Sequence, residues 1–251
     1  PRWNILYLFK LKKLIKKFNF SKVYDLQNSS RTSFYRKYLL NIDKWSSTET
    51  TLKKDENKKI FDKDSVLKRF DVQLINSGIK TKHTLKPDLS WSITNIDKIT
   101  NKYFSGKFII LFPFCSPKLS HKKWPYFNKL IAMIKDYHPN LETVIAPGPD
   151  EIEESKKVNA ISITEQDKCI NLTQLAGLIN KSSYVIANDT GPAHMAAHLG
   201  KKGIVIFGHH TTPEKVSIET DKYKAITVDN LENLSAGKVY QIIKEEIKLI
   251  N

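Results

Sequence analysis

Residues 183–216 read SYVIANDTGPAHMAAHLGKKGIVIFGHHTTPEKV. Two short runs of β-branched and aromatic residues, Tyr184–Ala187 and Ile204–Phe207, are typical of strands buried in a parallel sheet. The alanine-rich segment Pro192–Leu199 between them predicts a short helix. The stretch therefore predicts a compact β-α-β unit. Further strands and helices alternate along the chain, which indicates an α/β fold.

The turn between the first strand and the helix has the composition of an anion-binding loop. Gly191 can take a positive φ, and Pro192 suits the first helical position. Asp189 or Thr190 can cap the helix, whose free N–H groups and dipole attract phosphate. The loop Gly208–Pro213 leaves the neighbouring strand at the same carboxyl edge, where ligands of open α/β sheets bind. We therefore expect two polar loops to converge on one ligand crevice.

This motif also carries a family resemblance. The run NDTGPAHMAA at residues 188–197, followed by Phe207-Gly208 and a loop containing Thr211-Thr212-Pro213, resembles the signature of the lipopolysaccharide heptosyltransferases, glycosyltransferase family 9. The resemblance covers residues 108–216 well and residues 20–80 loosely. It implies a GT-B type fold of two Rossmann-like domains with parallel sheets, the N-terminal one incomplete.

The domain boundaries follow from composition and from this resemblance. Residues 1–90 are expected to form a partial acceptor domain, and residues 106–251 the nucleotide-sugar donor domain. Residues 91–105 are the predicted linker, with Trp91 as its docking residue. Residues 41–62 are polar and lysine-rich without clear periodicity, which predicts a long exposed loop.

The resemblance also implies which residues hold the donor. Ser116 and Lys122, ahead of Trp124, match a loop whose hydroxyl and lysine bind the donor phosphates; Lys123 fits that spacing less well, and either lysine could simply be solvated. Glu151, or Asp150 beside it, would accept hydrogen bonds from the ribose, although helix-dipole stabilisation explains these acids too. Asp189 would accept from the transferred sugar, or only shape its turn. The expected donor site comprises Ser116, Lys122, Glu151, Asp189, Thr190, Gly191, Pro192 and His194.

The N-terminal part gives fewer candidates. Residues 24–33 resemble the Asp-Leu-Gln loop of the family, which implies that Arg31 and Arg36 face acceptor phosphates; solvent-facing arginines are the alternative. The family begins with a Ser-Leu-Gly-Asp loop whose aspartate is the expected base, and residues 1–40 contain no such loop. We therefore expect a fragment without the first βαβ portion, and the catalytic base is unknown. Asp25 is the acidic residue near the right sheet edge, but we do not assign it as the base.

Charge and composition limit the partners. The net charge of +15 favours anionic partners such as acidic lipids or phosphorylated glycolipids. A lysine-rich codon usage would explain it equally well, and no nucleic-acid motif is present. Residues 1–20 are an amphipathic basic helix, which could cover a sheet or lie on an anionic membrane surface. Two cysteines and no signal peptide indicate the cytoplasm, and no apolar run approaches the roughly 18 residues of a membrane span.

The histidines do not predict a metal site. His194 and His198 lie four residues apart, but the helix lacks the glutamate of a His-Glu-x-x-His site. We therefore expect no metal and no cofactor. His209 and His210 stand where the family pattern has proline followed by a hydroxyl or acidic residue.

The function implied by the resemblance is inverting transfer of heptose from ADP-heptose to the lipopolysaccharide inner core or lipid A acceptor. It would take place at the cytoplasmic face of the inner membrane. One alternative is a family member that uses another nucleotide sugar. The other is a non-catalytic nucleotide-binding remnant.

Overall fold

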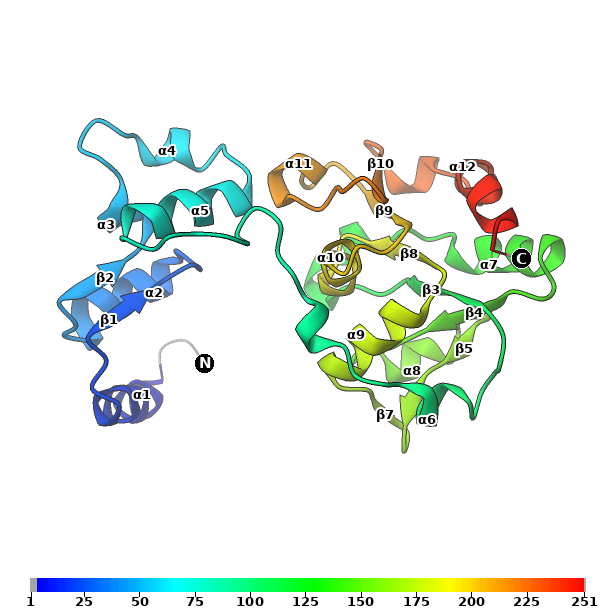
Figure 1. Cartoon of the computed structure of the whole chain (residues 1–251), viewed down its shortest axis with the longest axis horizontal. Helices are drawn as coiled ribbons and strands as arrows, with labels where there is room; N and C mark the ends of the chain where they lie inside the picture. Colours follow the sequence, from blue (N-terminus) through cyan, green and yellow to red (C-terminus); the bar gives the residue numbers. More distant parts are fainter. Residues whose placement is uncertain (1–3, 251) are drawn as a thin grey trace. The chain divides into compact units, whose positions relative to one another are not determined.

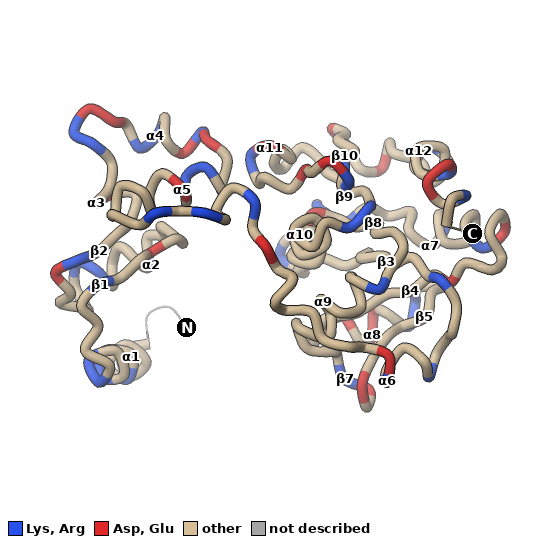
Figure 2. The backbone as a smooth tube through the Cα atoms, in the orientation of Figure 1, with Lys and Arg blue, Asp and Glu red and all other residues tan. Residues whose placement is uncertain are grey.

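The computed structural model describes residues 4–250. The chain divides into two compact units, Pro1–Leu85 and Lys86–Asn251, which are described separately below (Figure 1). Lysine and arginine are spread along both units, and acidic residues lie among most of them, whereas residues 4–24 carry lysines and no acidic residue (Figure 2). Among the described residues, none of the helices combines the length and the apolar character that crossing a bilayer requires.

The second unit is built on a six-stranded sheet in which every pair of neighbouring strands is parallel. The strand order is β10-β9-β8-β3-β4-β5, which is the parallel α/β arrangement that the sequence predicts. β3, β8 and β9 are buried along their whole length, in agreement with their continuous apolar sequences. The strands are β3 (Phe108–Phe112), β4 (Glu142–Ile145), β5 (Ile161–Ser162), β8 (Tyr184–Asn188), β9 (Gly203–Phe207) and β10 (Tyr223–Thr227).

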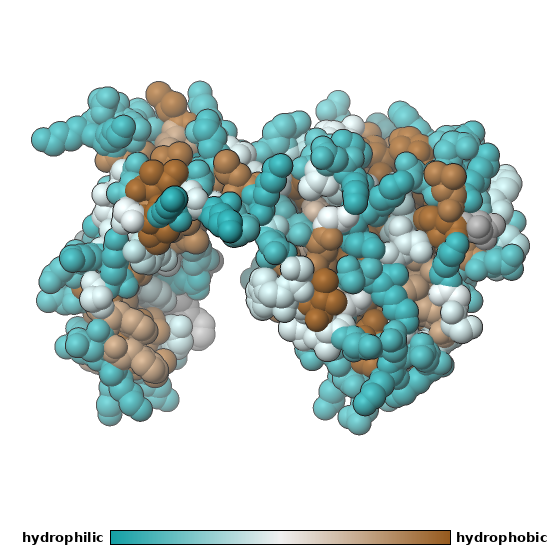
Figure 3. All heavy atoms as spheres, in the orientation of Figure 1, coloured by the Kyte–Doolittle hydropathy of each residue, from teal (hydrophilic) through white to brown (hydrophobic). Residues whose placement is uncertain are grey.

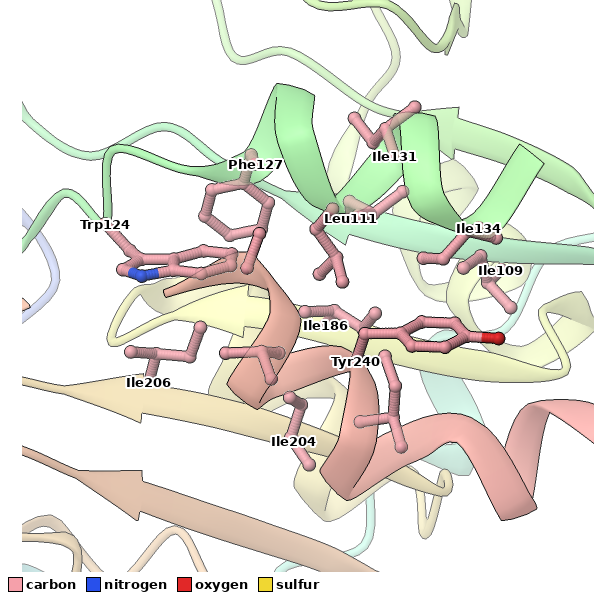
Figure 4. Close-up of a cluster of buried hydrophobic side chains, with 14 of the residues drawn as sticks. Ile109, Leu111, Trp124, Phe127, Ile131, Ile134, Ile186, Ile204, Ile206 and Tyr240 are labelled. Atoms are coloured by element: carbon pink, nitrogen blue, oxygen red, sulfur yellow. The ribbon is translucent and has the colours of Figure 1, made fainter. Parts of the chain in front are cut away.

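Helices cover both faces of this sheet. Because side chains alternate along a strand, Ile109 and Leu111 of β3 face one core, while Phe108, Ile110 and Phe112 face the other. The first core is closed by α7 and α12 and is drawn in Figure 4, and the second is closed by α9 and α10. The longer helices are α7 (Phe127–Tyr137), α9 (Leu172–Lys181), α10 (Gly191–His198) and α12 (Ala236–Lys248).

Short elements complete the second unit. Three of them are 3-10 turns, one is a small antiparallel hairpin, and the rest are single-turn helices. They are the 3-10 turns Ser90–Ser92, Pro117–Lys122 and Leu231–Asn233, the hairpin strands β6 (Thr164–Glu165) and β7 (Lys168–Cys169), and the helices α6 (Asp97–Thr100), α8 (Ile152–Ser155) and α11 (Pro213–Val216).

The predicted linker, residues 91–105, lies within the second unit. Ile96 and Ile99 are buried in the core that α9 and α10 close. Trp91 was expected to anchor this linker by packing its indole, and this expectation was wrong, because 79% of the residue is exposed. The buried residue of its 3-10 turn is Ser92 instead. The segment is therefore attached to the second unit by the packing of Ile96 and Ile99 in its core.

The first unit has a small parallel sheet of two strands, β1 and β2. Gln73 of α5 is buried beside them, and its amide donates to the carbonyl oxygens of Asp25 and Ser46 at 3.0 and 3.2 Å. The elements are α1 (Ile5–Lys17), β1 (Lys22–Tyr24), α2 (Ser30–Phe34), a π-helical turn (Tyr35–Leu39), β2 (Lys44–Ser46), α3 (Thr48–Thr51), α4 (Lys58–Phe61) and α5 (Val66–Asn76).

Two expectations for this unit need correction. Residues 41–62 do not form one long loop, because β2, α3 and α4 lie there; each spans only three or four residues, too few for a periodic pattern. The basic amphipathic helix does form as α1, capped by Asn4, but none of its residues is buried. Apolar atoms over α1 are exposed in Figure 3. Within the described residues, α1 therefore does not cover a sheet.

Candidate donor site

Three loops of the second unit start at one edge of its sheet. β3, β8 and β9 are parallel neighbours, so their carboxyl ends lie side by side. β3 leads into the loop that contains Lys122, β8 into the turn at Asp189, and β9 into the loop at His210. The sequence predicted two converging loops here, and the sheet order adds the third.

The side chain of Asn188 links two of these loops by hydrogen bonds. Its side chain is fully buried; Oδ1 accepts a hydrogen bond from the backbone N–H of Trp124 at 3.0 Å, and Nδ2 donates to the carbonyl of Pro113 at 2.9 Å. Both partners belong to the loop after β3, whereas Asn188 ends β8. The amide therefore fixes the position of Lys122, two residues before Trp124, relative to the turn at Asp189.

We expect Asn188→Ala to lower the free energy of unfolding of the second unit by about 2 to 3 kcal/mol, because it leaves a buried N–H and a buried C=O without partners. Urea denaturation followed by circular dichroism measures this change. Asn180→Ala is the matched control, because Asn180 is exposed at the end of α9 and should change stability by less than about 0.5 kcal/mol. Equal urea midpoints for the two variants would contradict a stabilising role for the hydrogen bonds of Asn188.

Asp189 lies at the centre of a cluster of basic side chains. Its side chain is only 4% exposed, and its Oδ2 accepts from Lys122 Nζ at 2.6 Å and lies 3.0 Å from His210 Nε2. Its other oxygen, Oδ1, is 3.6 Å from His194 Nε2. Lys122, His194 and His210 come from three different segments, so only the folded sheet edge brings them together.

These contacts decide the charge of the carboxyl group. Burial alone would raise the pKa of Asp189, but the polar contacts from His194, Lys122 and His210, together with the ammonium charge of Lys122, hold that pKa well below its usual range. Asp189 is therefore an ionised acceptor at neutral pH. It lies beside an ammonium group and the start of α10.

The start of α10 is open toward this cluster. Thr190 is the N-cap residue, and its side chain makes no capping bond; Oγ1 donates to the carbonyl of Asn188 at 3.3 Å instead. Gly191 is the first helical residue and does not adopt a positive φ, so that expectation was wrong; Pro192 follows it as the second. A Cβ atom added at Gly191 would meet no atom within 4 Å. The open space beside the helix N-terminus is suited to an anion.

The structure distinguishes the two adjacent lysines. Lys122 contacts Asp189, whereas Lys123 forms an ion pair with Glu154. Ser116 precedes the same 3-10 turn, is exposed, and makes no side-chain hydrogen bond with a described residue. Of the two loop residues assigned to donor phosphates, Lys122 thus lies in the cluster, and the Ser116 hydroxyl is free for a ligand.

Glu151 lies at the same sheet edge, after β4. Its Oε2 accepts a hydrogen bond from the backbone N–H of Gly148 at 2.7 Å, and it is the N-cap residue of α8. Asp150 beside it is exposed. The carboxylate of Glu151 is thus held in a fixed orientation by its own turn, with its other oxygen available to further donors.

A cavity adjoins the cluster on the β9 side. Its volume is about 470 Å³, and His121, whose ring also packs edge-on against His210, is part of its wall. The other charged or polar lining side chains are Ser120, Lys123, His209, Asp229, Asn230 and Glu232. Such a mixture of carboxylates, imidazoles and hydroxyls is suited to a polyhydroxylated ligand.

The candidates in the first unit are bound to local partners. Arg31 donates to Gln27 Oε1 at 3.3 Å, and Arg36 forms an ion pair of 2.6 Å with Glu49. Asp25 is buried, and its Oδ1 accepts from the backbone N–H groups of residues 27 and 28, which fixes the loop after β1. These contacts give Asp25 a structural role.

The histidines near Asp189 do not form a metal-binding group. The rings of His194 and His198 have centroids 6.4 Å apart on α10. Across residues 4–250, no group of three or more His, Cys, Asp or Glu side chains is arranged to hold a metal ion. His194 and His210 instead contact a carboxylate that Lys122 also contacts.

Two residues of this site were not assigned a role from the sequence. Asn188 was visible only as the first residue of the family motif and as a polar residue at the end of a buried strand. His210 was visible only as a departure from the family pattern. A polar residue at the end of a buried strand signals a loop anchor, but its partners lie 64 and 75 residues away and follow only from the sheet order.

Comparisons with known proteins identify the family and the fold of the chain. The model of glycosyltransferase family 9 (heptosyltransferase) matches residues 8–241. No curated protein sequence matches the chain significantly. The fold resembles that of E. coli heptosyltransferase WaaC with ADP, at 17% sequence identity and a TM-score of 0.63, over 90% of this chain and 73% of that chain. It also resembles WaaC with ADP-2-deoxy-2-fluoro heptose, at 16% identity and a TM-score of 0.66, over 96% of this chain and 76% of that chain. A third similar structure is that of E. coli ADP-heptose lps heptosyltransferase II, at 13% identity and a TM-score of 0.63, over 96% of this chain and 81% of that chain. The chain has the mixed α/β fold of GT-B type glycosyltransferases and belongs to glycosyltransferase family 9, the heptosyltransferase family.

Proposed function

We propose that this chain is an inverting glycosyltransferase that transfers heptose from ADP-heptose to the lipopolysaccharide inner core. The observation that carries the proposal is the pairing of Lys122 with Asp189 beside the open N-terminus of α10. An ammonium group and free helix N–H groups bind a diphosphate, and an adjacent ionised carboxylate accepts hydrogen bonds from sugar hydroxyls. Two solved structures with a similar fold are those of E. coli heptosyltransferase WaaC with ADP and with ADP-2-deoxy-2-fluoro heptose.

The proposed donor site uses the residues of this sheet edge. Thr190, Gly191 and Pro192 form the helix start that receives the diphosphate, with Lys122 and the hydroxyl of Ser116 beside it. Glu151 accepts from the ribose hydroxyls, and Asp189, with His194 beside it, receives the hydroxyls of the transferred sugar. No metal ion or cofactor is part of the proposal.

In the proposed reaction, a hydroxyl oxygen of the acceptor attacks the anomeric carbon of the donor sugar. The bond from that carbon to the diphosphate oxygen breaks, and the configuration inverts. The ammonium of Lys122 and the N-terminus of α10 stabilise the charge that develops on the leaving diphosphate. The hydroxyl proton passes to a base that we assign to none of the residues 4–250.

The acceptor assignments are also proposals. Arg31 and Arg36 would face phosphates of the lipopolysaccharide core or lipid A, which requires Arg36 to exchange its partner Glu49 for phosphate. The lysines of α1 would attract the anionic inner surface of the membrane. Transfer would then take place at the cytoplasmic face of the inner membrane.

Two other functions fit the same site. Phosphate and turn geometry recognise the diphosphate more than the sugar, and His209-His210 replaces the expected family residues, so another nucleotide sugar is the first alternative. A nucleotide-binding remnant without transferase activity is the second. Both alternatives keep the affinity for a nucleoside diphosphate. The first differs from the proposed function in its preferred sugar, and the second differs in having no turnover.

Calorimetric titration with ADP, ADP-heptose and a UDP-sugar tests the proposal. We expect selective binding of the ADP compounds, and Lys122→Ala should weaken it about 10- to 100-fold, because a charge-assisted contact to phosphate is lost. Lys118→Ala is the matched control, since Lys118 is an exposed lysine of the same 3-10 turn without a described partner. A folded protein that binds no ADP, or that loses equal affinity in both variants, would refute the assignment.

A further inference from the structure

His210 is held rigidly beside Asp189. Its side chain is only 7% exposed, and its ring stacks on Phe207 with centroids 5.9 Å apart and an interplanar angle of 18°. The ring of His121 packs edge-on against it at 5.5 Å. Its Nε2 atom lies 3.0 Å from Asp189 Oδ2. The imidazole thus has one fixed orientation, with Nε2 toward the carboxylate.

The second ring nitrogen identifies the protonation state. Nδ1 of His210 is buried and has no hydrogen-bond partner among the described residues. A doubly protonated ring would bury a second N–H without an acceptor, which is costly. Burial, together with the nearby ammonium of Lys122 and the ring of His121, holds the pKa of His210 below its usual value, although Asp189 acts in the opposite direction. The tautomer that fits this geometry is the neutral imidazole with its proton on Nε2, which donates a hydrogen bond to Asp189.

Two donors share one carboxylate oxygen in this arrangement. Lys122 Nζ and His210 Nε2 both contact Oδ2 of Asp189. A donor phosphate at the start of α10 would draw the ammonium of Lys122 away from this oxygen. Asp189 is almost fully buried, so an ionised carboxylate that lost its donor would be strongly destabilised. His210 would then be the donor remaining on that oxygen, with His194 near Oδ1.

We propose that His210 is a positioning residue of the donor site: its Nε2–H keeps the Asp189 carboxylate ionised and oriented while Lys122 moves from that carboxylate to the donor phosphates. The inference rests on the proposed function, because it requires a diphosphate at α10. The titratable groups that face Asp189 are Lys122, His194 and His210, and His121 faces His210.

Affinity for ADP as a function of pH tests this inference. His210→Leu removes the hydrogen-bond donor. At pH 8 this variant should bind ADP about 10- to 100-fold more weakly than the unmodified chain, because ADP binding would leave Oδ2 of the buried Asp189 carboxylate without a donor. The deficit should persist down to pH 6, because the pKa of Asp189 is held well below its usual range and the ionised carboxylate still needs a donor. His210→Gln keeps a neutral N–H near the position of Nε2 and should restore the affinity at every pH.

Controls separate this inference from the proposed function. His83→Leu changes an exposed histidine of the first unit that belongs to neither the cluster at Asp189 nor the adjoining cavity, and it should bind ADP like the unmodified chain. If the unmodified chain does not bind ADP, the proposed function fails. If it binds and His210→Leu binds equally well from pH 6 to 8, only the role of His210 fails.

A second measurement needs no variant. Nitrogen NMR shifts of the His210 imidazole in the unmodified protein at pH 7 report the protonation of both ring atoms. We expect a protonated Nε2 and a bare Nδ1. A proton on Nδ1, alone or on both nitrogens, would overturn the inference even if His210→Leu does not fold.

Discussion

Replacing Trp124 with alanine is expected to lower the free energy of unfolding of the second unit by about 3 to 5 kcal/mol. The indole is only 1% exposed and packs edge-on against Phe127, with ring centroids 5.0 Å apart (Figure 4). Its Nε1 donates to the carbonyl of Leu234 at 2.7 Å, which ties the loop after β3 to the segment ahead of α12. Truncation thus opens a cavity and leaves a buried carbonyl without its donor.

Urea denaturation of Trp124→Ala, followed by far-UV circular dichroism, measures this loss. Trp91→Ala is the matched control, because the exposed indole of Trp91 should contribute less than about 0.5 kcal/mol. Trp124→Phe should lie between the two, since it keeps most of the apolar volume but loses the N–H. A Trp124→Ala variant as stable as Trp91→Ala would show that the core around α7 and α12 is not organised as described.

Replacing Gly177 with alanine is expected to destabilise the second unit by about 3 kcal/mol or more. A Cβ atom at Gly177 of α9 would lie 1.9 Å from the backbone oxygen of Thr94. The segment at Thr94 cannot easily move away, because its N–H also bonds to the carbonyl of Thr173 at 3.4 Å and Ile96 is buried close by. The overlap is between backbone and Cβ, so no side-chain rotation relieves it.

Gly237 gives the contrasting case within the same unit. It lies in α12, and a Cβ atom there would meet no atom within 4 Å. Gly237→Ala should therefore stabilise the protein by about 0.5 to 1 kcal/mol through the higher helix propensity of alanine. Thermal unfolding of the two variants should shift in opposite directions. A neutral Gly177→Ala would mean that residues 90–104 do not pack on α9.

Trp124→Ala and Gly177→Ala are expected to differ in their effect on the donor site. Trp124 is two residues from Lys122, and its backbone N–H is one of the two groups that Asn188 holds. Loss of the indole should therefore loosen Lys122 relative to Asp189 as well as the core. Gly177 lies in α9, which takes part in none of these contacts, so its variant should weaken folding more than it changes ADP affinity in the molecules that remain folded.

The sequence by itself determined the parallel α/β fold, the family and the turn at Asp189. These follow from local patterns: a buried strand reads as a short apolar run, and a phosphate-binding helix start reads as a few small and polar residues in succession. The same reasoning failed for residues 41–62, where the elements are too short to be periodic. It also failed for Trp91, because apolar size alone does not say which side of a turn faces a core.

The tertiary structure alone decided which side chains share the site. Lys122 and Asp189 are 67 residues apart, and His210 follows Asp189 by 21 residues in another loop. Their contact depends on β3, β8 and β9 being neighbours, with Asn188 fastening the loop after β3 to the end of β8. The order of strands results from long-range packing against two cores, which no local window of the sequence contains. The roles inferred for Asn188 and His210 therefore depend on the folded sheet edge, whereas the motif at Asp189 could be read directly from the sequence.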